Sequence, residues 1–425
     1  MKASELLQVI EAGALSAYDH LYSDTAFQTR RYADAVRSFL ALYGDAKEAY
    51  VFSVPGRTEV LGNHTDHQQG RVLAASVDRD IITVAAPSGN EVIRVKSEGY
   101  PEDTVALADC DSTDAFARFS SASLLAGTVK GFRERGYYVG GFNAYTVSCV
   151  PKGSGLSSSA AYEVTIGNVM NYLHNGGRIP NEEIAKIAQF SENVYFGKPC
   201  GLMDQMACAV GGFVSIDFAN QAQPLIEPIS FSLEKAGLAL CILNTGGNHA
   251  DLNDDYASVP AEMGRVAAYF GKEVLRGITE QQLIANLSLL RVAAGDRAAL
   301  RALHFVREND RVQTAAALLK QGDAEGFLAQ VRASGASSFQ YLQNVYTVKN
   351  VEEQGLSVAL CLTEGLLKDK GCAFRVHGGG FAGTIQAFVK KEYAEDYRMV
   401  MDSVFGAGAC MMLSVRPVGA TRIDL

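Results

Sequence analysis

The residues best suited to chemistry lie in four short segments, and the first is rich in glycine and serine. It spans Val150 to Ala161 and reads VPKGSGLSSSAA. Glycines let a backbone approach a ligand closely, and a helix that starts directly after such a loop turns free N–H groups toward an anion. We therefore predict a phosphate-binding loop. It lacks the Gly-Lys-Ser/Thr ending of a P-loop, so the cation beside the phosphates must come from elsewhere. A flexible linker is the alternative, but strand-like and helix-like residues flank this loop directly.

The second segment, PGRTEVLGNHTDH, concentrates hydrogen-bonding side chains between glycines. His64, Asp66 and His67 could be metal ligands, although no third His or Cys follows at ligand spacing. Asn63, His64 and Asp66 suit a polyhydroxylated ligand better, because an amide, an imidazole and a carboxylate recognise hydroxyl groups by direction. Arg57 could then stabilise the charge of a transferring phosphoryl group.

The third and fourth segments are GKPCGLMDQ, which contains Asp204, and HGGGFAG, which starts at His377. An Asp after Pro and Gly at a helix start is most often a cap. Its functional alternative is a carboxylate that accepts or orients the proton of a ligand hydroxyl. The fourth segment formally matches the dinucleotide-binding glycine pattern, but it leads into a predicted strand, Thr384–Val389, instead of a helix. A turn that closes over a ligand fits it better.

Hydrophobic periodicity predicts the elements that position these segments. Residues 1–45 have helical spacing. The predicted strands of the first half are 50–54, 72–86, 91–96 and 145–150, and the predicted helices are 114–135, 160–174 and 181–195, the last with Asn181 as its N-cap. The predicted strands of the second half are 238–243, 374–376, 384–389 and 410–415, with a mostly helical region at 280–367. This mixture lacks strict βαβ alternation and indicates an α+β fold with two lobes.

Composition limits the class of protein. The chain has 425 residues, 48% of them hydrophobic, and a net charge of −9. No basic face favours nucleic acid or an anionic membrane as the main partner. The eight cysteines show no C-x-x-C spacing, and we see neither a signal-peptide pattern nor an apolar run long enough to span a membrane. We expect a cytoplasmic, monomeric globular protein.

Taken together and in this order, the segments resemble the GHMP kinase superfamily and, within it, the galactokinase family. The second segment is similar to the galactokinase signature Gly-Arg-Val-Asn-Leu-Ile-Gly-Glu-His-Thr-Asp-Tyr, and CGLMDQ is similar to the catalytic segment of that family. The resemblance runs from about residue 40 to the end of the sequence. It implies a two-lobe GHMP kinase fold with a ribosomal protein S5 domain 2-like N-terminal lobe and a ferredoxin-like C-terminal lobe. The implied domains are a helical extension (1–48), the N-terminal kinase domain (49–235) and the C-terminal kinase domain (236–425).

The resemblance also implies an activity, the ATP-dependent phosphorylation of galactose at its anomeric hydroxyl, and a role for each matching residue. Asp204 would accept or orient the proton of that hydroxyl, and Arg57 would stabilise the phosphoryl charge. Ser159 and Glu192 would bind Mg²⁺. The sugar would contact Asn63, His64, Asp66, Gly201 and Tyr256, and the ATP phosphates would contact Gly153, Ser154, Gly155, Leu156, Ser157, Ser158 and Ser159.

The chain departs from the family pattern mainly where the sugar is recognised. Asn63 replaces a Glu, His67 replaces a Tyr, His377 replaces a Ser or Thr, and residues 257–261 lack the usual Arg. Loss of a charge-assisted hydrogen bond changes discrimination by about 1.5–3 kcal/mol. A related sugar is therefore the alternative substrate: an N-acetylhexosamine, a uronic acid or a pentose. A non-catalytic sugar sensor is disfavoured, because the small residues after the serine run and the acidic and basic catalytic positions are all present.

Overall fold

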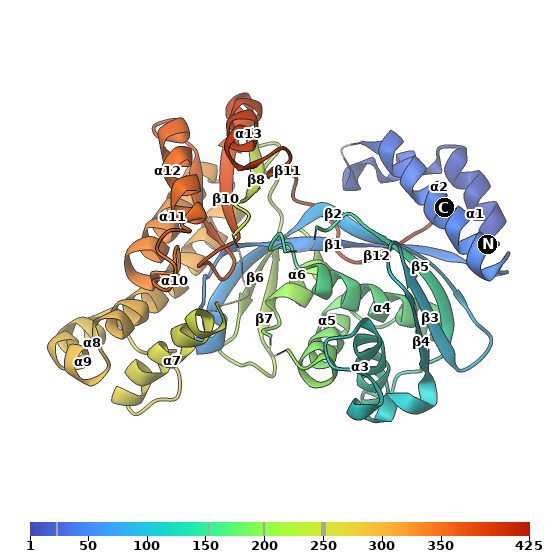
Figure 1. The fold of residues 1–425 in the computed structure, drawn as a ribbon, viewed down its shortest axis with the longest axis horizontal. Helices are drawn as coiled ribbons and strands as arrows, with labels where there is room; N and C mark the ends of the chain where they lie inside the picture. Colours follow the sequence, from blue (N-terminus) through green and yellow to red (C-terminus); the bar gives the residue numbers. More distant parts are fainter. Residues whose placement is uncertain (23, 152, 199, 248–251) are drawn as a thin grey trace.

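Two β-sheets organise the chain (Figure 1). The computed structural model describes residues 1–22, 24–151, 153–198, 200–247 and 252–425, so Lys152 and Pro199 of the first and third segments lie outside the described residues. The first sheet has the order β12-β1-β2-β5-β3-β4, and β6 pairs with β2 and with β7. Its strands are β1 (Tyr50–Leu61), β2 (Arg71–Pro87), β3 (Val92–Ser97), β4 (Glu102–Ala106), β5 (Phe142–Ser148), β6 (Phe213–Asp217), β7 (Leu225–Ile229) and β12 (Thr421–Ile423).

Strand β1 carries the second segment into the centre of the molecule. The prediction that this strand stops at Pro55 was wrong, because β1 continues to Leu61 with a register shift between Pro55 and Arg57. Such an irregularity bends a strand and re-aims the side chains beside it. A Cβ atom on Gly56 would lie 2.7 Å from the carbonyl oxygen of Leu156, so this glycine lets the serine-rich loop pack directly on β1.

Helices cover both faces of the first sheet (Figure 1). One face holds α3 (Ser121–Glu134), α4 (Ser158–Asn175), α5 (Asn181–Phe190), a π-helical turn (Ser191–Phe196) and α6 (Met203–Val210), and the other holds α1 (Ala3–Glu11), a 3₁₀ segment (Ala14–Leu21) and α2 (Thr25–Tyr43). The predicted helical extension is confirmed. The prediction of a helix from 114 was wrong, because α3 begins at Ser121, where the Ser120 hydroxyl accepts a hydrogen bond from the Ser123 N–H. The predicted Asn181 cap was also wrong: the cap position is Pro180, and the Asn181 side chain donates to the carbonyls of Ala209 and Ala420.

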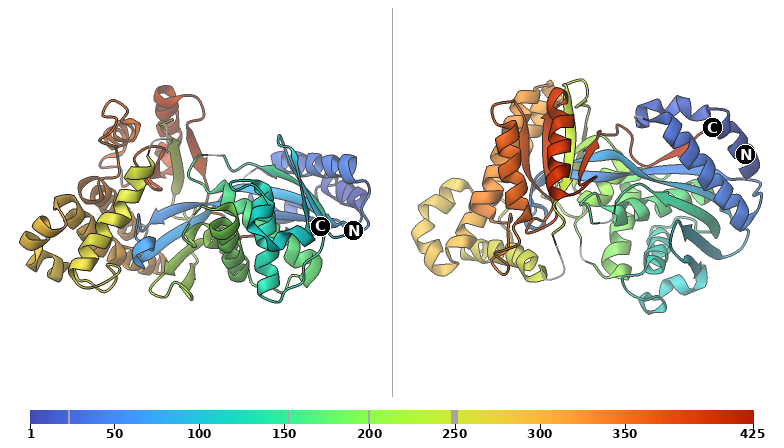
Figure 2. Two further views of the ribbon diagram at one scale, coloured as in Figure 1. Left: turned by 60° about the horizontal axis from the view of Figure 1, so that its bottom comes forward. Right: turned by 45° about the horizontal axis from the view of Figure 1, so that its top comes forward.

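The second sheet is antiparallel and has the order β11-β8-β10-β9, which confirms the four strands predicted in the second half. Its strands are β8 (Leu238–Asn244), β9 (Ala373–His377), β10 (Thr384–Lys390) and β11 (Cys410–Leu413). The helices of this half are α7 (Asn253–Tyr269), α8 (Glu280–Ala285), α9 (Leu287–Ala293), α10 (Asp296–Gln321), α11 (Ala324–Ser337), a π-helical turn (Ser338–Leu342), α12 (Gly355–Leu367) and α13 (Lys391–Phe405). Helices α11, α12 and α13 pack against this sheet, α10 also contacts the first sheet, and α8 and α9 lie at the opposite end of the molecule from the N-terminal helices (Figure 2). No helix in the described ranges is both long and apolar enough to cross a membrane.

Two cores hold the first sheet in place. The larger lies between the sheet and helices α3 to α6 and continues into β8, α10 and α11. The smaller lies under α1 and α2 and contains a buried ion cluster around Asp80. The Asp80 carboxylate is fully buried and accepts hydrogen bonds from Arg31 (2.5 Å), Arg416 (3.3 Å) and the Tyr22 hydroxyl (2.5 Å). This cluster joins the N-terminal helices, the sheet and the segment that leads to β12.

Candidate active site

An arginine–aspartate pair joins β1 to the start of α6. Arg57 donates from Nε to Asp204 Oδ1 (2.8 Å) and from Nη2 to Oδ2 (2.7 Å), which is the bidentate geometry of a strong ion pair. Arg57 Nη1 also donates to the Gly155 carbonyl of the serine-rich loop. The Asp204 side chain keeps 30% of its surface exposed. The pair therefore connects the strand, the loop and the helix and leaves one side of the carboxylate open.

The surroundings of Asp204 keep it ionised. Burial alone would raise the pKa of this carboxyl, but the Arg57 charge, the Arg57 hydrogen bonds and one from the Ser157 hydroxyl (2.5 Å) outweigh burial and hold its pKa below the usual range. In the described ranges its hydrogen bonds come from side chains across the site, which does not support the helix-cap alternative. An ionised carboxylate with an open side can accept a hydrogen bond from a ligand hydroxyl.

The serine-rich loop is anchored on its inner side. Leu156 is buried, and its carbonyl accepts a hydrogen bond from the Arg57 N–H (3.0 Å). Gly155 and Ser157 both have left-handed backbone angles, with φ of +72° and +55°. Helix α4 begins at Ser158, so its unpaired first-turn N–H groups lie at the end of the loop, as anion binding requires. Gly153 and Gly155 are exposed, and the serines at 157–159 are half-buried.

Two buried glutamates lie beside the pair. Glu192 stands in the π-helical turn, and Gln205 Nε2 donates both to Glu192 (2.7 Å) and to Glu163 of α4 (3.1 Å). Lys198 Nζ lies 3.0 Å from the other Glu192 oxygen. Burial and the adjacent Glu192 charge raise the pKa of Glu163, whose second carboxylate oxygen is buried without a hydrogen-bond partner.

This pair of carboxylates suits a hard cation. Orphaned carboxylate oxygens are the ligands that Mg²⁺ prefers, and Mg²⁺ completes its shell with water and substrate phosphates. A Mg²⁺ site therefore needs few protein ligands. The described residues agree with this, because they hold no cluster of three or more His, Cys, Asp or Glu at ligand geometry. The sequence analysis missed Glu163; a lone acidic residue on an otherwise apolar stretch of helix was the signal that could have found it.

A cavity of about 290 Å³ lies at the end of β1, and its lining begins with Glu59, two residues after Arg57. It is lined by Glu59, Asn63, His64, Asp66, His67, Tyr256, Pro260 and Gly379. The structure thus brings four of the five predicted sugar contacts together. The fifth, Gly201, borders Asp66, since a Cβ atom there would lie 2.5 Å from Asp66 Oδ2. Burial raises the pKa of Asp66, and the Asp204 charge adds to this effect.

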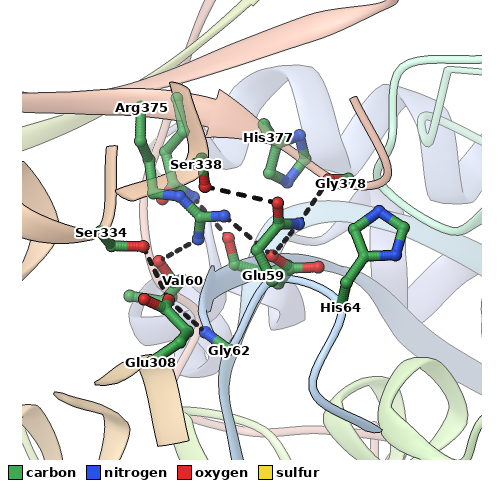
Figure 3. A network of polar contacts seen from close by, with 12 residues as sticks. Glu59, Val60, Gly62, His64, Glu308, Ser334, Ser338, Arg375, His377 and Gly378 are labelled. Carbon is green, nitrogen blue, oxygen red and sulfur yellow. Dashed lines mark hydrogen bonds and ion pairs between the residues drawn. The ribbon is translucent and has the colours of Figure 1, made fainter. Parts of the chain in front are cut away.

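Asn63 occupies the wall of this cavity but is fully buried. Figure 3 shows Glu59 and Arg375 in the polar network of this wall. Its Nδ2 donates to Glu59 Oε1 (3.0 Å) and to the Gly378 carbonyl (2.7 Å), and its Oδ1 accepts from Asn344 (2.7 Å). Glu59 also forms an ion pair with Arg375 Nη2 (3.1 Å). The sequence analysis missed Glu59, although the galactokinase signature has Asn at this position and the difference was visible.

The glycines of the fourth segment, HGGGFAG, form a turn beside this network. The prediction that they lead into a strand is confirmed by β10. A Cβ atom on Gly379 would lie 2.6 Å from the Tyr256 ring, so the turn packs tightly on α7. His64 Nε2 is hydrogen-bonded to the Gly379 carbonyl (2.9 Å), which occupies one nitrogen that a metal would need. His377 lies behind the turn between Thr58 (3.0 Å) and Thr384 (2.9 Å).

Comparison with known proteins agrees with this geometry. The chain matches the GHMP kinases N terminal domain over residues 120–212 and the galactokinase galactose-binding signature over residues 37–87. It is 30% identical over 394 residues to a galactokinase from Streptomyces coelicolor. The aligned region covers 91% of this chain and 97% of that protein. The chain belongs to the galactokinase family. Membership makes it a sugar phosphotransferase of the GHMP kinase type, and it confirms the resemblance identified from the sequence.

Solved structures of the GHMP kinases share the fold of this galactokinase-family chain. Lactococcus lactis galactokinase, crystallised with galactose, superposes with a TM-score of 0.76 at 24% identity and covers 91% of this chain and 98% of its own. Mevalonate kinase from Methanococcus jannaschii gives a TM-score of 0.59 at 12% identity, with 89% and 99% covered. The expected α+β GHMP kinase fold is therefore confirmed.

Proposed function

We propose that this chain transfers the γ-phosphoryl group of ATP to the anomeric hydroxyl of galactose and releases galactose 1-phosphate and ADP. The observation that carries the proposal is the position of Arg57, which is hydrogen-bonded both to Asp204 and to the serine-rich loop, next to the polar cavity. Phosphoryl transfer depends on positioning and charge stabilisation more than on covalent chemistry, and this network offers both.

The Asp204–Arg57 pair acts at the reacting hydroxyl in this proposal. Asp204 accepts a hydrogen bond from the anomeric hydroxyl through its open side and receives or directs the proton as the hydroxyl oxygen attacks phosphorus. Arg57 holds the carboxylate ionised and faces the charge that develops on the phosphoryl oxygens. The same guanidinium fixes the distance between the loop and the carboxylate, because it binds both.

The serine-rich loop and the glutamates form the nucleotide side. Backbone N–H groups from Gly153 to Ser159 bind the ATP phosphates. Ser159 and Glu192 hold Mg²⁺, which neutralises phosphate charge when bound. Lys198 Nζ lies 3.0 Å from Glu192 and offsets the charge of this carboxylate. The sugar contacts are His64, Asp66, Gly201 and Tyr256 around the cavity, with Asn63 in its wall.

We extend the proposal to the setting of the enzyme. It works as a cytoplasmic monomer, and its chain divides into the helical extension 1–48, the domain that carries the ATP loop and the sugar segment (49–235), and the C-terminal domain (236–425). Strand β12 crosses this division, since it pairs with β1 in the first sheet.

An ADP-release assay over a sugar panel tests the activity. The panel contains galactose, N-acetylgalactosamine, galacturonic acid and arabinose, with an Asp204→Asn variant as the matched control. We expect the highest kcat/KM with galactose. In the Asp204→Asn control we expect no turnover above background. If the enzyme phosphorylated another sugar of the panel well and galactose not at all, that sugar would replace galactose as the proposed substrate. Sugar binding without any turnover would support a sensor instead.

A further inference from the structure

Positions 59 and 63 carry the residue types of the family signature in exchanged places. The signature has Asn at the position of Glu59 and Glu at the position of Asn63. In the structure the two side chains touch, because Asn63 Nδ2 donates to Glu59 Oε1 (3.0 Å). The exchange therefore keeps one carboxylate and one amide in this wall and moves the negative charge from the loop onto strand β1.

Asn63 has little left to offer a ligand. A primary amide has two N–H donors and one carbonyl acceptor. Both donors are used, by Glu59 Oε1 and by the Gly378 carbonyl, and the acceptor is bound by Asn344 at 2.7 Å. The side chain is also fully buried. Its contacts are those of a residue that fixes the glycine turn against β1.

Glu59 has a free oxygen in the same cavity. Its Oε1 accepts hydrogen bonds from Asn63 (3.0 Å) and Arg375 (3.1 Å), which lock the carboxylate in one orientation. In the part of the chain that the structure describes, Glu59 Oε2 accepts no hydrogen bond. It is not one of the buried polar atoms without a partner, so it remains accessible from the cavity. The side chain retains 9% exposure at the cavity wall. An oriented carboxylate oxygen that faces the cavity can accept a hydrogen bond from a ligand hydroxyl group.

Charge in and around the cavity further restricts the ligand. Asp66 and Glu59 line it, and Asp204 lies close by. The nearby guanidinium groups are each paired, Arg57 with Asp204 and Arg375 with Glu59. Burial, with the neighbouring His64, lowers the pKa of His67 to about 3, so this ring adds no positive charge. A ligand carboxylate in this cavity would face like charges, which disfavour its binding.

We propose that Glu59, not Asn63, recognises a hydroxyl group of the substrate, and that the site accepts uncharged sugars and rejects uronic acids. Asn63 and Arg375 are positioning residues that aim the Glu59 carboxylate. The proposal rests on the proposed function, because it assumes that this cavity binds the sugar that is phosphorylated. It also assigns the departure at position 63 to a rearranged hydroxyl contact instead of a lost one.

The test combines enzyme variants with deoxy sugars. Steady-state kcat and KM are measured for the wild type, Glu59→Gln, Asn63→Glu and the exchange variant Glu59→Asn/Asn63→Glu. The substrates are galactose and its 2-, 3-, 4- and 6-deoxy derivatives. We expect Glu59→Gln to lower kcat/KM for galactose on the order of 10- to 100-fold, the range of a lost charge-assisted hydrogen bond. For the one deoxy sugar that lacks the recognised hydroxyl, the same variant should lose less than about threefold.

The exchange variant distinguishes a lost contact from a folding defect. Asn63→Glu alone places a second carboxylate beside Glu59, so we expect a large rise in KM, whereas the exchange variant restores the single charge and should recover KM to within about fivefold of the wild type. Thermal unfolding of each variant verifies that the enzyme is folded, because Glu59→Gln leaves the buried Arg375 without its ion pair.

Three results would overturn the inference while leaving the proposed function intact. They are an equal loss of kcat/KM for every deoxy sugar in Glu59→Gln, an exchange variant no better than Asn63→Glu, and wild-type turnover of galacturonic acid equal to that of galactose. A wild-type enzyme that phosphorylates no sugar of the panel would instead remove the proposed function itself.

Discussion

Two aspartates in this molecule pair with buried arginines and differ in their access to solvent. Asp80 lies on β2 and binds Arg31 and Arg416; Asp204 lies at the start of α6 and binds Arg57. Burial would raise the pKa of both carboxyls, and in both cases the neighbouring arginines reverse that effect. The difference is access. The Asp80 side chain is fully enclosed, whereas the Asp204 side chain is 30% exposed.

Access decides what each pair can do. Asp80 has all its hydrogen-bonding capacity filled by protein, so it can only hold elements together, here α2, the sheet and the segment before β12. Asp204 has its charge fixed by the same type of partner and keeps one side free for a ligand. The comparison indicates that an ion pair becomes a reactive site when one side of the carboxylate is left without protein partners.

The largest expected effect comes from Asp204→Asn. The substitution preserves shape and removes the charge that accepts the hydroxyl proton, so kcat should fall about 10²- to 10⁴-fold. The unfolding midpoint should change little, because water can reach the open side of the pair. Coupled ADP release and thermal unfolding measure the two quantities. A variant that keeps more than about a tenth of wild-type kcat would place Asp204 outside the reaction.

Asp80→Asn should show the opposite pattern. It leaves two buried guanidinium groups facing a neutral amide, so the free energy of unfolding should fall by about 3–5 kcal/mol. The folded fraction should keep a kcat within about twofold of the wild type. Urea titration followed by circular dichroism measures the loss. A kcat loss as large as that of Asp204→Asn in fully folded protein would break the comparison.

Acid should erase that difference in stability. The pKa of Asp80 is lower in the folded state than its ordinary value, so its contribution is fully present above the unfolded pKa and is lost as pH falls through the folded pKa. The gap in unfolding free energy between wild type and Asp80→Asn should therefore narrow below about pH 4. Urea titrations at pH 7 and pH 3.5 measure it, and a constant gap would contradict the role of the charge.

Glu192→Gln should change the dependence on Mg²⁺. The substitution removes a charged oxygen ligand next to the loop, so the Mg²⁺ concentration for half-maximal rate should rise at least about 10-fold. Glu163→Gln is the comparison variant, because Glu163 shares the Gln205 amide with Glu192 and has one carboxylate oxygen without a hydrogen-bond partner. We expect a smaller shift there. Equal shifts in both variants would assign the metal to the pair as a unit.

Gly201→Ala should have the smallest effect of this set. Its Cβ atom would lie 2.5 Å from Asp66 Oδ2, so the carboxylate must shift, and KM for the sugar should rise several-fold, corresponding to about 1 kcal/mol. Gly365→Ala is the control, because Gly365 is an exposed position of α12 with no atom near its added methyl group. The control should leave KM unchanged and add up to about 1 kcal/mol of stability.

The parts of the fold that depend on local pattern were predictable. Helix α4, strand β2 and the strands of the second sheet follow from periodicity and flanking glycines, and they are close to their predicted bounds. The continuation of β1 through Pro55 was not, because a register shift lets the strand accommodate a residue without an N–H group. Strands β4, β6, β7 and β12 were missed as well; they are short, with three to five residues each, and are defined by their pairing partners.

The site was predictable where one segment supplies several groups and less so where distant segments meet. Arg57 and Asp204 lie 147 residues apart in the sequence. Each was a candidate from its own segment, and the family motifs assigned both to one site. The contact between Glu59 and Asn63, the Glu163–Gln205–Glu192 bridge and the Asp80 cluster depend on which side chains the fold brings together. The sequence pattern of one segment contains no information on which side chains of distant segments come into contact.

Strand β12 has a consequence for the order of synthesis. Its residues pair with Val51, Phe52 and Ser53 of β1, and Arg416 just before it is fully buried against Asp80. The first sheet, begun at residue 50, is therefore completed only by residues translated more than 360 positions later. While the ribosome is still translating the second half, β1 keeps an unpaired edge and Asp80 lacks one of its two arginines. The N-terminal lobe can therefore complete its sheet only after Ile423 has been synthesised, and until then the open edge of β1 is available for pairing with other strands.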